Sequence, residues 1–410
     1  MKVIKYVLIL SVFLSVCAGL LSAQQDIQII AVTNARLIDG NGAAPLNNMT
    51  IVIRNGRFSA IGRPEEVTLP VDAFSIDAQG KTVIPGLIDA HFHMNYPDSR
   101  EQPFLLNEAL CAFRSVPLLY RHLMGGITTI LDAGAYKNVS VMAKKAFNDG
   151  LLTGSRPVVV GERINGTGGH GVSRFDMAYE ADGADEFRKA VREQLKAGAD
   201  LIKILPPYSR EELQAAIEET HLHQKTVAVH SGIYNRQYAF VRWAVEYGAD
   251  CIMHAYALPD EVITIMGEKG ICSVPTMSIM MKLHLGGRFV ADNKEPHAYE
   301  IIFQKMKDAG VKMAVGTDAI YEYLNENPGL YFDEVERFVK NGYTPMEAVT
   351  AATKTGAEVL NVADRLGTIE RGKLADLLVL DADPLMDIRN LRKAVVIIQQ
   401  GKIIKNNLKN

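Results

Sequence analysis

VIPGLIDAHFH, at residues 83–93, is an apolar run that ends in two histidines. An apolar run of this length is typical of a buried strand. Successive side chains on a strand point to opposite faces, so residues i and i+2 point the same way. His91 and His93 should therefore face one point, with Phe92 on the other side. Two convergent imidazoles at a strand end form half of a metal site.

The middle of the chain repeats a unit of an apolar strand followed by a helix. The strand candidates are 83–90, 127–132, 157–161, 200–204, 226–230, 250–253, 271–275 and 312–316. Between them lie helix-like segments such as 104–124, 185–197, 209–223, 235–247, 259–268 and 297–309, and two more follow the last strand, at 332–340 and 346–353. Eight such units in series predict an α/β fold, a (β/α)8 TIM barrel, which we place at residues 85–365.

Both ends of the mature chain are rich in short strands. Ile51-Arg54 and Phe58-Ile61 flank the turn pair Asn55-Gly56, which favours a hairpin. Strand-like runs return at 375–381 and 394–400. We therefore predict a small β-sandwich domain formed by both chain termini, from residues 24–84 plus 366–410.

The first residues have the layout of a secretory signal peptide, which we place at residues 1–23. Lys2 and Lys5 precede the apolar stretch 6–21, and Ser22-Ala23 offers small residues for cleavage. A lipid anchor at Cys17 is the weaker alternative, because Val16 stands where a lipoprotein signal usually has a smaller residue. The expected location is outside the cytoplasm, either periplasmic or secreted.

Composition excludes some classes of partner. The 410 residues carry a formal net charge of -3, which gives no electrostatic reason to expect nucleic acid or an anionic membrane surface. No segment beyond the leader looks long and apolar enough to span a membrane, so we expect no membrane partner once the signal is removed. The partner that remains is a small-molecule substrate.

Metal-binding residue types recur at the predicted strand ends. His91, His93, His230 and His254 place four of the ten histidines there, Lys203 lies on the fourth strand, and Asp318 follows the eighth. A single histidine or aspartate at such a place is usually structural, for example as a helix cap. The coincidence of all of them favours a shared site, since the C-terminal ends of barrel strands carry function. A lysine between Ile202 and Ile204 is costly to bury as a cation.

These motifs resemble those of the amidohydrolase superfamily. The likeness extends from PGLIDAHFH at residues 85–93 through Gly316-Thr317-Asp318 to GTIERGKLADL at residues 367–377. It implies two divalent metal ions, which we expect to be zinc. His91, His93 and Asp318 would hold one ion, and His230 and His254 the other. Carbon dioxide would carboxylate Lys203, and the resulting carbamate would bridge the two ions.

The resemblance also implies the reaction, which is hydrolysis of an amide by attack of metal-bound hydroxide. Asp318 is the expected catalytic base, which takes a proton from the water and delivers it to the leaving amine. The loop Gly168-Gly169-His170-Gly171 resembles one branch, the prolidase-like Xaa-Pro dipeptidases and ochratoxinase-like amidases. In that branch His170 is expected to be catalytic and to contact the substrate. The expected substrates are dipeptides of the Xaa-Pro or Xaa-Arg/Lys type, or N-acyl amino acids.

The substrate pocket departs from that branch. Relatives often have His-Ala-Tyr at the fifth strand and a glutamate before the sixth-strand histidine, where this chain has His230-Ser231-Gly232 and Met253. Tyr234 and Arg236 are our candidates for binding a substrate carboxylate, because of their position and charge.

Three alternatives remain beside the leading hypothesis. A cyclic amidase or a lactonase would use the same metal ligands, and only the substrate distinguishes it. An exported, catalytically inactive binding protein is a second, although such a protein has no need of Lys203 or Asp318. A mononuclear deaminase is disfavoured, because no acidic residue follows His230 closely. The family often forms multimers, so a homo-oligomer is a further expectation.

Overall fold

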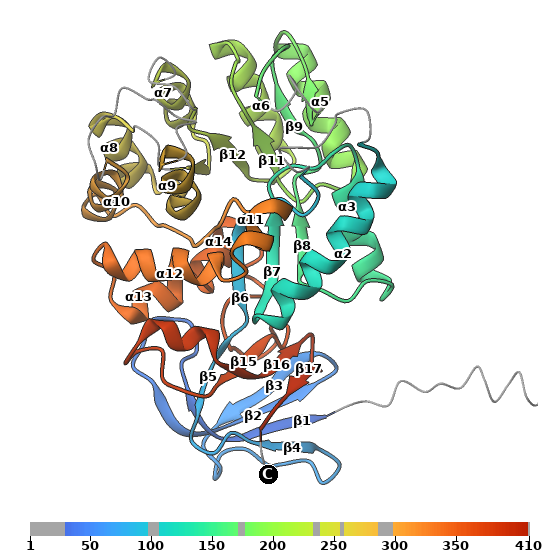
Figure 1. Ribbon diagram of the computed structural model, residues 1–410, viewed down its shortest axis with the longest axis vertical. Helices are drawn as coiled ribbons and strands as arrows, with labels where there is room; N and C mark the ends of the chain where they lie inside the picture. The colour runs from blue at the N-terminus through green and yellow to red at the C-terminus, as the bar shows by residue number, and fades with distance from the viewer. Residues whose placement is uncertain are drawn as a thin grey trace, which may run out of the picture.

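A small β-sheet domain and a helix-lined barrel make up the protein (Figure 1). The computed structural model describes residues 29–96, 106–170, 177–232, 238–254, 258–285 and 298–408. The predicted signal peptide, Cys17, Tyr234 and Arg236 lie outside these residues. The fold class is the predicted one, a TIM barrel with a small sheet domain built from both ends of the chain.

The small domain is one mixed eight-stranded sheet in the order β17-β16-β15-β5-β1-β2-β3, with β4 paired to β1. Antiparallel pairing of β15 with β5 joins the C-terminal strands to the N-terminal ones. Asn55 and Gly56 form the β2–β3 turn with φ of 52° and 74°, as a tight hairpin requires. The strands are β1 (Ile30–Leu37), β2 (Leu46–Arg54), β3 (Arg57–Gly62), β4 (Phe74–Asp77), β5 (Thr82–Pro85), β15 (Leu377–Leu380), β16 (Ala394–Gln399) and β17 (Lys402–Asn406).

Gly86 separates the sheet domain from the barrel. The prediction of a single strand at 83–90 was wrong, because β5 ends at Pro85 and a new strand, β6 (Leu87–Phe92), begins the barrel. A Cβ atom on Gly86 would lie 2.2 Å from the Thr128 hydroxyl oxygen, so only glycine allows the two layers to approach this closely.

The barrel strands form two parallel sheets. The chain around the eighth predicted strand, at 312–316, links one sheet to the other. One sheet is β6-β7-β8 and the other is β10-β9-β11-β12-β13-β14. The predicted strand at 312–316 is present only as isolated bridges, which pair Met313 with Ser273 and Ala319 with Phe92. The remaining strands are β7 (Ile127–Asp132), β8 (Arg156–Val159), β9 (Arg163–Asn165), β10 (Ala178–Glu180), β11 (Ile202–Ile204), β12 (Val227–His230), β13 (Cys251–Met253) and β14 (Cys272–Val274).

Helices surround these strands, and the predicted ones are present within a few residues of their expected bounds. The helices in the described part of the chain, whether predicted or not, are α2 (Glu108–Met124), α3 (Val139–Asn148), α5 (Ala184–Ala197), α6 (Arg210–Leu222), α7 (Tyr238–Glu246), α8 (Asp260–Lys269), α9 (Met277–Leu285), α10 (Ala298–Asp308), α11 (Tyr321–Glu326), α12 (Leu330–Lys340), α13 (Pro345–Ala351), α14 (Lys354–Val359) and the short η3 (Ile388–Arg392). Capping boxes at Ser209 and Thr344 fix where α6 and α13 begin. Within the described part of the chain, no helix has the length and apolar character needed to cross a membrane.

A buried ion pair joins the barrel to the sheet domain. Arg156 of β8 donates to both carboxylate oxygens of Asp376, at 2.5 and 3.2 Å. Asp376 also accepts the backbone N–H of Gln400 at 2.8 Å. Removing one partner of a buried pair leaves the other charge unpaired away from water.

We therefore expect Asp376→Ala to lower the free energy of unfolding by about 3–5 kcal/mol. The measurement is the shift in the denaturant midpoint. Asp381→Ala, which removes an exposed partner of Lys81, is the matched control and should cost no more than about 1 kcal/mol. Equal shifts in the two variants would contradict the argument.

Candidate metal centre

The carboxyl ends of the barrel strands bring the predicted site residues together. His91 is the second-to-last residue of β6, His230 ends β12, and His254 directly follows β13. Lys203 is the central residue of β11, and Asp318 follows the bridged eighth segment. These side chains come from five parts of the barrel and meet at one end of it.

His91, His93 and Asp318 form the tightest group. Each offers a ligand atom, and these atoms all lie within 4.8 Å of one another. The Asp318 Oδ1 atom is 3.3 Å from His91 Nε2 and 3.2 Å from His93 Nε2. One cation with bonds of about 2.0–2.2 Å to nitrogen and oxygen fits between atoms at these separations.

The imidazole rings continue from this group across the barrel. The ring centroids of His91 and His254 are 4.6 Å apart, and those of His254 and His230 are 4.5 Å apart. His170 then stacks on His230 at 5.1 Å. The structure therefore places the two predicted sets of metal ligands side by side, with the solvent-exposed His170 at one end of the row.

The protonation states in this group suit a cation. Burial lowers the pKa of His91 to about 3 and holds the pKa values of His230 and His254 well below the usual range, so these imidazoles are neutral. The Nδ1 atom of His93 donates to the Gly134 carbonyl at 3.1 Å. If His93 is neutral, its one proton is on Nδ1 and its Nε2 atom carries a lone pair. That lone pair faces the Asp318 Oδ1 atom, which also has only lone pairs to offer. A cation between them turns this repulsion into two ligand bonds, so the donor set fits a divalent metal ion.

Lys203 lies beside these rings in an apolar setting. Its side chain is 1% exposed, and its Nζ atom is 2.6 Å from the Met253 sulfur. Burial lowers the pKa of Lys203 to about 7. The neutral amine is therefore well populated near neutral pH, and this is the form that can react with carbon dioxide.

Asp89 is a positioning residue that the sequence analysis did not single out. Its buried carboxylate accepts the Thr317 hydroxyl at 2.7 Å and the Thr317 N–H at 3.0 Å. The Asp318 N–H in turn donates to the His91 carbonyl at 2.7 Å. These bonds hold Asp318 in the left-handed region, at a φ of 52°, and so direct its carboxylate toward the histidines.

Thr276 orients His254 in a similar way. The His254 Nδ1 atom is 2.8 Å from the Thr276 hydroxyl and 3.9 Å from the Asp318 Oδ2 atom, so the hydroxyl holds the ring beside that carboxylate. Glu334 of α12 accepts the N–H groups of Met277 and Ser278 and so fixes the helix start beside Thr276. A hydrogen bond of this kind sets the tautomer and the direction of a ligating imidazole.

We expect Thr276→Val to weaken metal binding about 10–100-fold, because the variant keeps the shape of the side chain and loses the hydroxyl. Competition with a chromophoric chelator measures this without an assay of turnover. Thr276→Ser keeps the hydroxyl and should bind metal as the wild type does. Equal affinity in Val and Ser variants would show that the contact does not orient His254.

Arg163 of β9 is another buried group near the site that the sequence analysis missed. Its guanidinium donates to the Met177 carbonyl, and it lies over the Tyr96 ring with its Cζ atom 5.4 Å from the centroid. The side chain is 3% exposed, and its charge acts on both His170 and Lys203. No local pattern marks this arginine, because its contacts with Met177 and Tyr96 form only in the folded barrel.

Comparison with known proteins identifies the class. The profile of the Amidohydrolase family matches residues 82–405, and the chain belongs to this family. The chain is 26% identical to ochratoxinase of Aspergillus niger over 93% of its own length and 87% of that protein. It is 25% identical to imidazolonepropionase of Geobacillus sp., over 88% of this chain and 90% of that one.

Solved structures agree with this assignment. A Xaa-Pro dipeptidase with methionine bound in its active site is similar with a TM-score of 0.80 and 28% identity, over 92% of this chain and 100% of that chain. The protein is therefore a hydrolase of the amidohydrolase superfamily that acts on C–N bonds, and its relatives include members of the prolidase and ochratoxinase branch.

Proposed function

We propose that this protein is a binuclear metal-dependent amidohydrolase that cleaves dipeptides or N-acyl amino acids and releases the C-terminal amino acid. The observation that carries the proposal is the unbroken row of imidazoles from His93 to His170, with Asp318 at one end and Lys203 beside it. A structural cluster would not need a carboxylate, a buried lysine and neutral imidazoles at one point.

Each ion would have its own ligands. His91, His93 and Asp318 would hold the first, and His230 and His254 the second. Lys203 would join them after its neutral amine adds to carbon dioxide and loses one proton, which gives an anionic carbamate. When bound, the two ions supply Lewis acidity, which polarises the substrate carbonyl and acidifies water.

The protein's own groups would then move the protons. The Asp318 carboxylate would accept a proton from the attacking water at the oxygen that faces the histidines. It would return that proton to the leaving nitrogen as the C–N bond breaks, so that an amine and a carboxylic acid are formed. His170 is exposed at the end of the row, where its ring can donate a hydrogen bond to the substrate carbonyl oxygen.

The relatives support the substrate class. One is named for Xaa-Pro dipeptides and another for ochratoxin. A free carboxylate on the substrate needs a cationic partner, and Arg163 supplies a buried guanidinium close to His170, alongside the earlier candidates Tyr234 and Arg236. The relative named for an imidazolone favours a second candidate function, a cyclic amidase on the same ligands.

Turnover on a library of dipeptides and N-acyl amino acids tests the proposal. The protein without residues 1–23 would be loaded with zinc in bicarbonate, and a chelator-treated sample would be the control. We expect release of Pro, Arg, Lys or an aromatic amino acid, and no release after chelation. Two bound metals with no cleavage of any linear amide would move the assignment to cyclic amides and lactones. Metal binding with no turnover on either would favour a binding protein.

A further inference from the structure

The outward face of α2 lacks charge over three helical turns. The exposed residues after Glu108 are Ala109, Ala112, Phe113, Val116, Pro117 and Tyr120. Their spacing of three and four residues makes one continuous stripe, which on a soluble protein normally faces a core. The flanking arginines, Arg114 and Arg121, turn away toward α11 and the residues around it, where they contact Tyr321 and Asn325.

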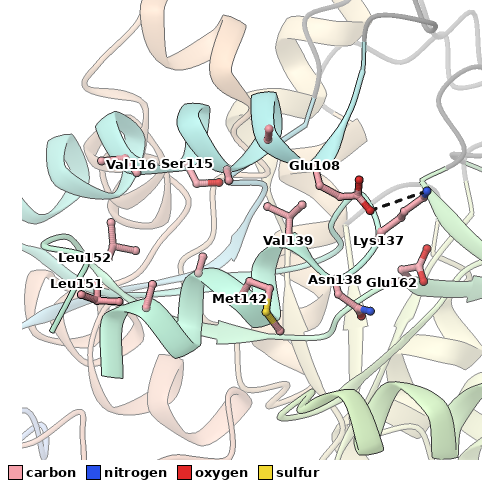
Figure 2. Close-up of a pocket in the computed structure, with 14 residues that line it drawn as sticks. Glu108, Ser115, Val116, Lys137, Asn138, Val139, Met142, Leu151, Leu152 and Glu162 are labelled. Atoms are coloured by element: carbon pink, nitrogen blue, oxygen red, sulfur yellow. Dashed lines mark ion pairs between the residues drawn. The ribbon is translucent and has the colours of Figure 1, made fainter. Parts of the chain in front are cut away.

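A groove runs beside this stripe, between α2 and α3 (Figure 2). It has a volume of about 790 Å³, and its walls include Val116, Met142, Leu151 and Leu152. Phe113 is 76% exposed and Leu151 is 82% exposed, so apolar side chains project beside the groove. A surface that offers both projecting side chains and a hollow can pair with a second copy of itself.

The charges around the groove fit such a pairing. Figure 2 shows Glu108, Lys137 and Glu162 gathered at one end, and the Glu108–Lys137 ion pair there is long, at 3.9 Å. An apolar centre with a charged edge is the usual anatomy of a protein interface. Because the edge carries both signs, the Lys137 of one copy can meet a carboxylate of the other. A single lysine at the edge does not suit an anionic membrane, which attracts clusters of basic residues.

The exposed area is sufficient for a dimer. Phe113, Val116, Tyr120, Met142 and Leu151 are 76%, 47%, 49%, 55% and 82% exposed. For side chains of these sizes the exposed surface is about 500 Å² per copy, and two copies together bury about 1,000 Å², the lower limit of a specific interface. An apolar patch of this size is about the largest that a typical soluble monomer exposes, and such patches are often functional.

We propose that the α2–α3 face is the interface of a homodimer, in which α2 of each copy packs against the α2–α3 groove of the other. The occupant is thus a second copy of this chain. The proposal does not depend on the substrate or on the metal content of the active site.

Sedimentation of residues 24–410 tests the interface. We expect the wild type to sediment as a dimer or a larger even-numbered assembly, and the double variant Phe113→Asp, Val116→Lys to have half that mass with an unchanged circular dichroism spectrum. Met386→Lys, at a residue 84% exposed and outside this face, is the matched control and should keep the wild-type mass. A monomeric wild type, or a double variant with the wild-type mass, would overturn the proposal.

A cross-linking experiment gives an independent result. Ala112→Cys places a thiol near the middle of the stripe, and mild oxidation should convert two such thiols into a disulfide between copies. Background is low, because Cys111 and Cys251 are buried and Cys272 is half-buried. Met386→Cys should give no covalent dimer. A monomeric wild type that instead binds a synthetic peptide of residues 1–23 would assign the groove to the leader and contradict the homodimer.

Discussion

Asp318→Asn is expected to lower kcat by at least about a thousandfold, because the variant loses both the proton acceptor and a charged metal ligand. The amide of asparagine has nearly the size of the carboxylate, so the barrel should fold as before. Asp318 stands between His91 and His93 at 3.3 and 3.2 Å, and no other carboxylate belongs to that cluster among the described residues. Bound metal should fall together with kcat.

Asp132→Asn is the matched control for this variant. Asp132 is a fully buried aspartate that ends the neighbouring strand β7, and its Oδ1 atom accepts the Met94 N–H at 3.0 Å, a role that the carbonyl oxygen of asparagine can keep. Metal content and kcat should stay near the wild-type values. If Asp318→Asn retained activity within tenfold of the wild type, Asp318 would not be the base, and the proton path would need another acceptor.

The strand ends could be predicted from sequence because the signal is local. The run at 127–132 was predicted with the bounds that β7 has, since an apolar segment bounded by glycine turns defines a strand by itself. The same local pattern located His91, His230 and His254, which the structure places in one row of rings. The prediction of a regular strand failed at 312–316, where the chain pairs with its neighbours through isolated bridges only.

The supporting contacts could not be predicted, because they depend on residues far apart in the chain. Asp89 and Thr317 are separated by 228 positions, and the sequence around Asp89 gives no sign of its partner. Thr276 likewise follows a strand as an ordinary polar residue, and its bond to His254 exists only once β13 and β14 pair. Periodicity identifies which residues end strands, whereas the partners of a side chain follow from the closed barrel.

Lys203→Ala is expected to lose the second metal ion and at least about a thousandfold in kcat, because alanine has no amine to form the anionic carbamate that would help to hold the ions. The alanine leaves a cavity where the side chain lay, so a small carboxylate such as propionate should enter and restore part of the activity. Lys203→Met fills the same space with an apolar chain and should be inactive with or without propionate.

The carbamate itself can be observed without an assay of turnover. Isotope-labelled bicarbonate should give a carbamate resonance in the wild-type NMR spectrum, and this signal should be missing from Lys203→Ala. Full activity of Lys203→Ala, or a wild type with two metals and no carbamate signal, would contradict the bridging role. The contact of Nζ with the Met253 sulfur supports that role, because a thioether stabilises an ammonium far less than a carboxylate would. The apolar setting thus favours the neutral amine that carbon dioxide requires.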